Sequence, residues 1–207
     1  MTNVEQIANN YMLYFLVPAW IVPGLADYAC HRRSRIETTS GLHEAILHFL
    51  MIKVVGLPIL MGLLLEINAL VILLMAIAYF VHLALALWDV SYAVSKRTVS
   101  PIEQHVHSFL EVLPFMALSF VVCLYWSQAQ ALVGLGSERA DFMLRWKDPP
   151  LPASYLITVI ATVVVFLGLP YSEEVWRCYR AAKRSRLRHV KAEAIPQTTI
   201  EPPTDGG

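Results

Sequence analysis

The chain has 207 residues, of which 57% are hydrophobic and only 15% charged, with a formal net charge of zero and a mean hydropathy of +0.52. Soluble domains carry about 25% charged and about 45–50% apolar residues, so this composition excludes an ordinary soluble domain and predicts an integral membrane protein. The three cysteines, Cys30, Cys123 and Cys178, are far apart in the sequence, which argues against both a disulfide framework and a thiolate metal site.

Five apolar segments follow one another along the chain, at about 11–29, 43–65, 68–92, 105–126 and 154–175. Each reaches the length of ~20 residues that crosses the hydrocarbon core of a membrane as a helix. We therefore expect an all-α protein, a five-helix transmembrane bundle. Residues 1–10 would form an extracytoplasmic N-terminus, residues 11–180 the transmembrane domain, and residues 181–207 a basic and then disordered cytoplasmic tail.

The basic residues predict how the bundle is oriented. Of the 16 Lys and Arg, 12 fall in the turn between segments one and two, the turn between segments three and four, and the tail after segment five. Because Lys and Arg concentrate on the cytoplasmic side, we expect the N-terminus outside and the C-terminus in the cytoplasm, in a bacterial cytoplasmic membrane. The basic stretch is expected to prolong the last helix along the anionic inner leaflet, and no nucleic-acid partner is expected.

Segments one and two share a pattern of polar residues with segments three and four. The first pair carries Asp27, Arg35, Ser40, Glu44 and His48. The second pair carries Asp89, Arg97, Ser100, Glu103 and His107. We interpret the two pairs as pseudo-repeated antiparallel hairpins that form a four-helix core. In the orientation above, their carboxylates and imidazoles lie at one depth, near the cytoplasmic end.

Helical spacing selects candidate metal ligands from this layer. Residues four apart lie on one face of a helix, which pairs Glu44 with His48 and Glu103 with His107. The same spacing pairs Asp27 with His31 on the first segment, and Asp89 is added from the third. The candidate ligands are therefore Asp27, His31, Glu44, His48, Asp89, Glu103 and His107. Weaker candidates, as ligands or as neighbours of the site, are His82, Glu111, Glu37 and Lys53.

Other charged residues near this layer have simpler expected roles. Lys53, near the middle of the second segment, is expected to pair with Glu111, since an intramembrane charge needs a partner. Arg35 and Arg97 are expected to bind lipid headgroups or an anionic substrate. The two glutamates at 173–174 would either support the metal ligands or lie at the surface.

Carboxylates and histidines that point inward from four antiparallel helices resemble the ferritin-like di-iron carboxylate bundles, in which two helices each provide a Glu and two each provide Glu-x-x-His. The resemblance covers the polar layer between residues 27 and 111, with E-x-x-x-H in place of E-x-x-H and Asp27 and Asp89 in place of glutamates. It implies two divalent metal ions, iron in the first place and zinc or manganese as alternatives. It also implies a membrane oxidoreductase (a hydroxylase, desaturase or oxidase) for a lipid or quinone-like substrate, with a cytoplasmic electron donor.

Other interpretations of the same residues stay open. The protein could be a zinc-dependent membrane lipid hydrolase, or a non-enzymatic metal-binding protein, or a haem protein with His48 and His107 as axial ligands. Ser100 to Glu103 also forms a capping box, and Ser40 could cap the second segment. The role of the fifth segment and the formation of a homodimer are likewise open.

Overall fold

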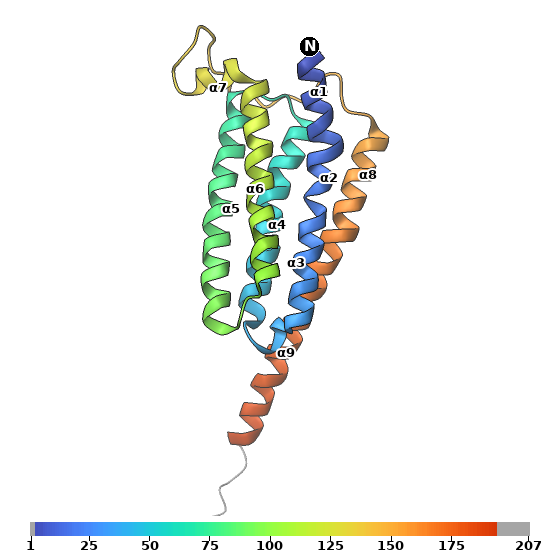
Figure 1. The fold of residues 1–207 in the computed structure, drawn as a ribbon, viewed down its shortest axis with the longest axis vertical. Coiled ribbons are helices and arrows are strands. Elements are labelled where there is room, and N and C mark those ends of the chain that lie inside the picture. The colour runs from blue at the N-terminus through green and yellow to red at the C-terminus, as the bar shows by residue number, and fades with distance from the viewer. Residues whose placement is uncertain (1–2, 194–207) are drawn as a thin grey trace, which may run out of the picture.

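A computed structural model of the chain describes residues 3–193. Regular structure in this range is helical, apart from one antiparallel bridge between Leu65 and Trp146. Figure 1 shows the long helices running side by side in one bundle, with the N-terminus at one end and α9 projecting from the other. The predicted all-α class is confirmed.

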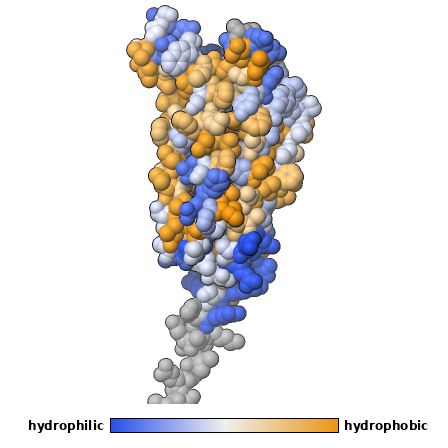
Figure 2. Space-filling view, viewed as in Figure 1, coloured by the Kyte–Doolittle hydropathy of each residue, from blue (hydrophilic) through white to orange (hydrophobic). Residues whose placement is uncertain are grey.

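Five helical stretches are long and apolar enough to cross a membrane, as expected for an integral membrane protein. They are Asn3–Ser34, Gly41–Leu64, Ala69–Lys96, Pro101–Leu124 and Ala153–Arg188. Figure 2 shows that much of this face is apolar between two more polar ends. Large apolar side chains of the spans, such as Phe80 and Leu87, are well exposed, which suits a surface that faces lipid.

The first span is a nearly continuous helix whose winding changes near its middle. It consists of α1 (Asn3–Tyr11), the π-helical turn η1 (Met12–Leu16), α2 (Val17–Ala19) and α3 (Ile21–Ser34). Helix therefore begins at Asn3, within the stretch expected to be an extracytoplasmic N-terminus. The short turn η2 (Ile36–Thr38) connects this span to the next.

The other spans follow with short connections, except for the long segment between α6 and the fifth span. The second, third and fourth spans are α4 (Gly41–Leu64), α5 (Ala69–Lys96) and α6 (Pro101–Leu124). The short helix α7 (Trp126–Leu132) follows α6. The fifth span consists of α8 (Ala153–Val163), the π-helical turn η3 (Val164–Gly168) and α9 (Leu169–Glu193). The predicted helical continuation through the basic stretch is confirmed by α9. The predicted disordered tail lies beyond the described residues.

The two serine caps predicted from the sequence have different outcomes. The Ser100 hydroxyl accepts a hydrogen bond from the Glu103 backbone N–H at 3.2 Å, and Pro101 occupies the first helical position, so this cap is confirmed. The predicted cap by Ser40 is wrong, because its buried hydroxyl makes no hydrogen bond and the Tyr92 hydroxyl instead donates to the Ser40 carbonyl at 3.0 Å.

At the α9 end the five spans form a closed ring. In this ring α4 packs on α5, α5 on α6, α6 on α3, α3 on α9, and α9 on α4. The packing does not confirm the predicted pairing into two repeated hairpins, since α9 packs against both α3 and α4. The open question about the fifth segment is thereby answered: its second half is a wall of the core.

At the N-terminal end the fifth span leaves this ring. There α8 packs mainly against η3 of its own span, and Figure 1 shows it to one side, next to α2. The remaining spans enclose an apolar core that includes Val71, Ile72, Met75 and Val121.

Candidate metal centre

Most of the buried polar side chains in residues 3–193 lie together at the α9 end. We call this group the polar cluster; it consists of Asp27 and His31 on α3, Glu44 and His48 on α4, Asp89 on α5, Glu103 and His107 on α6, Glu174 on α9, and Arg97 in the α5–α6 turn. Each span thus contributes at least one side chain. All seven residues that the sequence selected as metal ligands lie in this cluster.

One set of four side chains has the geometry of a metal site. Suitable ligand atoms of Asp27, His31, Glu103 and His107 all lie within 4.8 Å of one another. Asp27 Oδ1 is 2.8 Å from His107 Nε2 and 3.3 Å from His31 Nε2, and Glu103 Oε1 is 3.5 Å from His31 Nε2. Two helices far apart in the sequence, α3 and α6, thus direct oxygen and nitrogen atoms to one point.

A second set adjoins the first and shares His31 with it. Ligand atoms of His31, Glu44 and His48 also lie within 4.8 Å of one another. On its other side, His48 Nε2 lies 3.1 Å from Asp89 Oδ2. The structure therefore contains buried His, Asp and Glu groups that could hold a metal ion, and these groups contain no sulfur atom.

Glu174 connects the two histidines at the centre of the cluster. Its Oε2 lies 3.1 Å from His31 Nδ1 and its Oε1 lies 3.0 Å from His48 Nδ1. The two imidazole rings stack with centroids 4.1 Å apart and an angle of 7° between their planes. Because one carboxylate holds both Nδ1 atoms, both Nε2 atoms point away from α9 toward the other carboxylates. A carboxylate that orients a histidine in this way is typical of metal sites.

Two buried polar atoms of the cluster have no hydrogen-bond partner among the described residues. They are His31 Nε2 and Asp89 Oδ1, whose side chains are almost completely buried. Buried polar atoms are nearly always paired in folded proteins, so these two atoms are available to a ligand such as a metal ion.

The charge of the cluster leads to the same conclusion. Five buried carboxylates face one guanidinium, which leaves four negative charges without compensation. Protonation of three histidines would offset only three of these charges, whereas two divalent cations would offset all four. Since uncompensated charge inside a protein is very unfavourable, the charge of the cluster is compatible with a bound cation.

Arg97 lies inside the cluster and not at a lipid headgroup. Its side chain is 4% exposed and its Nη2 lies 2.5 Å from Glu44 Oε1, while the same guanidinium also pairs with Glu103. Burial alone would lower the pKa of Arg97, but hydrogen bonds to Glu103 and Glu44 raise it above its ordinary value. Arg97 therefore stays charged and holds two carboxylates on adjacent helices together.

The weaker candidates are spread around the cluster. His82 and Glu111 line a cavity of about 40 Å³ that borders it. Lys53 is exposed, with its Nζ 4.4 Å from the Phe49 ring centroid, and the predicted pair with Glu111 is not found among the ion pairs of residues 3–193. Glu37 pairs with an arginine of α9, away from the cluster. Arg35 is exposed at the end of α3, and nothing in the structure tests its predicted binding of headgroups.

Sequence reasoning missed Tyr171 and left the role of Glu174 undecided. The Tyr171 hydroxyl lies 2.9 Å from both Asp27 Oδ2 and the Gly24 carbonyl oxygen. Tyr171 and Glu174 lie three residues apart near the start of α9, which places them on one helix face. This spacing was available in the sequence as a signal that α9 turns a polar face to the cluster.

Comparison with known proteins provides no function to transfer. No protein family, no curated protein and no solved structure matches the chain. The likeness to ferritin-like bundles is therefore one of architecture alone, and the function has to be argued from the cluster itself.

Proposed function

We propose that the protein is an integral membrane dinuclear metal oxidoreductase, with iron as the expected metal, that acts on a lipid or another membrane-soluble substrate. One observation carries the proposal, namely the stacked pair of His31 and His48 with both Nδ1 atoms on Glu174. This arrangement turns two Nε2 atoms in the same direction from rings 4.1 Å apart. Two-metal sites hold their ions at a similar spacing, about 3.5–4 Å.

The neighbouring side chains divide naturally between the two ions. His31 would bind one ion with Asp27, Glu103 and His107, which already converge on one point. His48 would bind the other ion with Glu44 and Asp89, and Arg97 would keep Glu44 and Glu103 in position. Oxygen and nitrogen ligands without thiolate suit iron, manganese or zinc.

The space next to the cluster favours oxidation of a C–H bond. The cavity of about 40 Å³ between the cluster and Trp20 is lined largely by apolar groups, among them Met51, Ile52 and Leu110. A methylene group fits against these apolar side chains, which supports a C–H bond as the target of the reaction. A redox-active metal pair supplies the activation of dioxygen. In a hydroxylation, one oxygen atom enters the C–H bond and the other leaves as water, with two electrons and two protons taken from a donor.

The side chains around the metals would orient this chemistry. Tyr171 holds one oxygen of Asp27, so the other oxygen remains available to a metal. Glu111 lies at the cavity wall, where a carboxylate can accept or deliver the protons that the reaction needs. By the distribution of basic residues, the site would lie in the cytoplasmic leaflet of a bacterial membrane, within reach of a cytoplasmic electron donor.

A haem protein is a poorer interpretation of the same residues. The Nε2 atoms of His48 and His107 face Asp89 at 3.1 Å and Asp27 at 2.8 Å, and not an open slot between two helices. The adjoining cavity of about 40 Å³ is far too small for a porphyrin.

Elemental analysis of detergent-purified protein tests the metal pair, beside a Glu44→Ala/His107→Ala variant. We expect about two ions per wild-type chain and loss of metal from the variant. Reduced, iron-loaded protein in lipid nanodiscs should then transfer label from ¹⁸O₂ to its substrate. Two zinc ions with oxygen-independent lipid cleavage would replace the proposal with a hydrolase, and equal metal content in both proteins would refute the shared site.

A further inference from the structure

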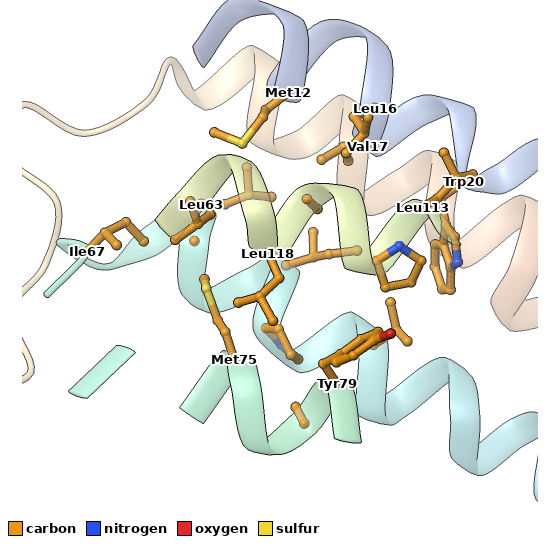
Figure 3. Close-up of a pocket in the computed structure, with 18 of the residues that line it drawn as sticks. Met12, Leu16, Val17, Trp20, Leu63, Ile67, Met75, Tyr79, Leu113 and Leu118 are labelled. Carbon is orange, nitrogen blue, oxygen red and sulfur yellow. The ribbon is translucent and has the colours of Figure 1, made fainter. Parts of the chain in front are cut away.

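An apolar cavity occupies the core of the bundle at the N-terminal end. It lies between the first span, α4, α5 and α6 and has a volume of about 150 Å³. Figure 3 shows Met12, Leu63 and Ile67 toward one end of this space and Trp20 and Leu113 toward the other. The proposed function does not yet use this cavity.

The wall of the cavity consists mainly of hydrocarbon. Its polar side chains Asn9 and Lys147 lie at the end that is farther from the polar cluster. Toward the cluster the wall is formed by aliphatic side chains and by the rings of Trp20 and Tyr79. A buried water needs several polar partners, and an apolar cavity of about 150 Å³ stays dry and binds benzene or xenon. The volume and the lining therefore suit a small apolar molecule and not a lipid chain.

This cavity lies in line with the smaller one that borders the polar cluster, and Trp20 lines both. On three helices a residue of the larger cavity stands three positions from a residue of the smaller one, namely Val55 and Ile52 on α4, Tyr79 and His82 on α5, and Leu113 and Leu110 on α6. Three residues correspond to a rise of about 4.5 Å along a helix. A small molecule that leaves the larger cavity in this direction therefore passes Trp20 and reaches the space beside Asp27, His48 and Asp89.

The cluster itself is enclosed by protein. The five spans form a ring around it, and Asp27, His31 and Glu44 are at most 2% exposed. Charged groups also occupy the end of the bundle next to the cluster, where Arg97 pairs with Glu44 and Glu103. Because an apolar molecule is more stable among hydrocarbon side chains than beside hydrated or charged groups, the apolar half of the bundle is its favourable approach to the cluster.

We propose that the apolar cavity holds dioxygen and leads it past Trp20 to the metal site. The inference rests on the proposed function for the use of dioxygen, although the binding of a small apolar gas in the cavity needs no metal. Dioxygen is apolar and small enough for a space of about 150 Å³ that a lipid chain would overfill. In this assignment the larger cavity supplies the dioxygen, and the smaller cavity beside the cluster receives the C–H bond.

Xenon is an apolar stand-in for dioxygen whose position can be seen directly, so crystals pressurised with xenon test the gas site. We expect an anomalous peak of xenon in the cavity near Trp20 in the wild type and none in Ala78→Phe, in which a phenyl ring fills the space. Ala84→Phe is the matched control and should keep the peak, since Ala84 is exposed on the same helix and does not line the cavity. A wild-type cavity without xenon, or one filled by a detergent or lipid chain, would overturn the inference.

The rate at which dioxygen oxidises the reduced, iron-loaded protein tests the route. Stopped-flow mixing with increasing dioxygen should give a second-order rate constant that is several-fold lower in Ala78→Phe than in the wild type or in Ala84→Phe, at equal metal content. Ala117→Phe, which fills the cavity from α6, should slow the reaction in the same way. An unchanged rate constant in both filled variants would overturn the route.

The two measurements also separate this inference from the proposed function. Two metal ions in a protein whose cavity takes up no xenon would refute this inference alone. Xenon in the cavity of a protein that binds no metal would refute the proposed function and retain the gas site.

Discussion

At the α9 end of the bundle five spans close around charged side chains. At the N-terminal end α8 lies outside the ring, and the other four spans surround an apolar cavity. The charged end needs the fifth wall, since carboxylates exposed to lipid would cost several kcal/mol each. The apolar end needs no such closure, because apolar side chains can face lipid tails at little cost. The same helices thus hold a cluster of charged side chains at one end and an apolar cavity at the other.

Close contact between α3 and the fifth span makes this closure possible. A Cβ atom built on Gly24 would lie 2.6 Å from Cδ2 of the buried Leu167, so glycine permits this approach without displacing the leucine side chain. The approach lets Tyr171 and Glu174, on the first turns of α9, reach the cluster. The difference between the two ends therefore depends on packing that a few substitutions can disturb.

The largest effect is expected from His31→Ala, which removes the side chain shared by both metal groups. The purified variant should contain almost no metal, as measured by elemental analysis. His43→Ala serves as the control, because His43 packs against Tyr92 and Trp88 outside the cluster. Retention of metal by His31→Ala would show that the ions bind elsewhere.

Arg97→Gln compares an ion pair of the charged end with one of the opposite end. Loss of a buried partner should destabilise the metal-free protein by about 3–5 kcal/mol, because Glu44 and Glu103 both lose their pairing with the guanidinium. The matched change Arg145→Gln removes an exposed cation from Glu66 and Asp141 and should destabilise the protein far less, because solvent screens exposed ion pairs. Denaturant unfolding in detergent measures both, and equal costs would contradict the distinction between the two ends.

Glu174→Gln keeps the shape of the side chain but weakens its hold on the two histidines. Metal affinity should fall about 10–100-fold, the usual cost of losing a carboxylate that orients ligand histidines. Competition with a chelator measures this loss. In Glu173→Gln, which affects a neighbour paired with Tyr28 and Arg32 near the surface, affinity should not change. An equal loss of metal affinity in both variants would show that Glu174 does not orient the two histidines for metal binding.

The smallest effect is expected from Gly24→Ala, which adds one methyl group where α3 meets Leu167. The stability should fall by about 1 kcal/mol, at the low end for overpacking, since the end of a leucine side chain can turn aside. Gly56→Ala is the control within a helix: its new Cβ would meet nothing within 4 Å, so the substitution should stabilise α4 slightly. A stabilised Gly24→Ala variant would argue against close contact of the fifth span.

The sequence allowed the five spans and the seven candidate ligands to be predicted, because apolar length and helical spacing are local properties. The roles of Glu174 and Tyr171 were not predicted, since they depend on α9 packing between α3 and α4. Arg97 was expected at a headgroup because an arginine beside a span usually lies at the interface, and only the fold brings it between two glutamates. The apolar cavity was not predicted either, since it is lined by four different spans and depends on how they pack.

X-ray absorption at the metal edge of purified, metal-loaded protein tests the central claim most directly. We predict two ions per chain, a first coordination shell of nitrogen and oxygen alone, and a second metal at about 3.5–4 Å. A spectrum with no metal neighbour at that distance, or with sulfur in the first shell, would contradict a dinuclear site built on His31, His48 and Glu174.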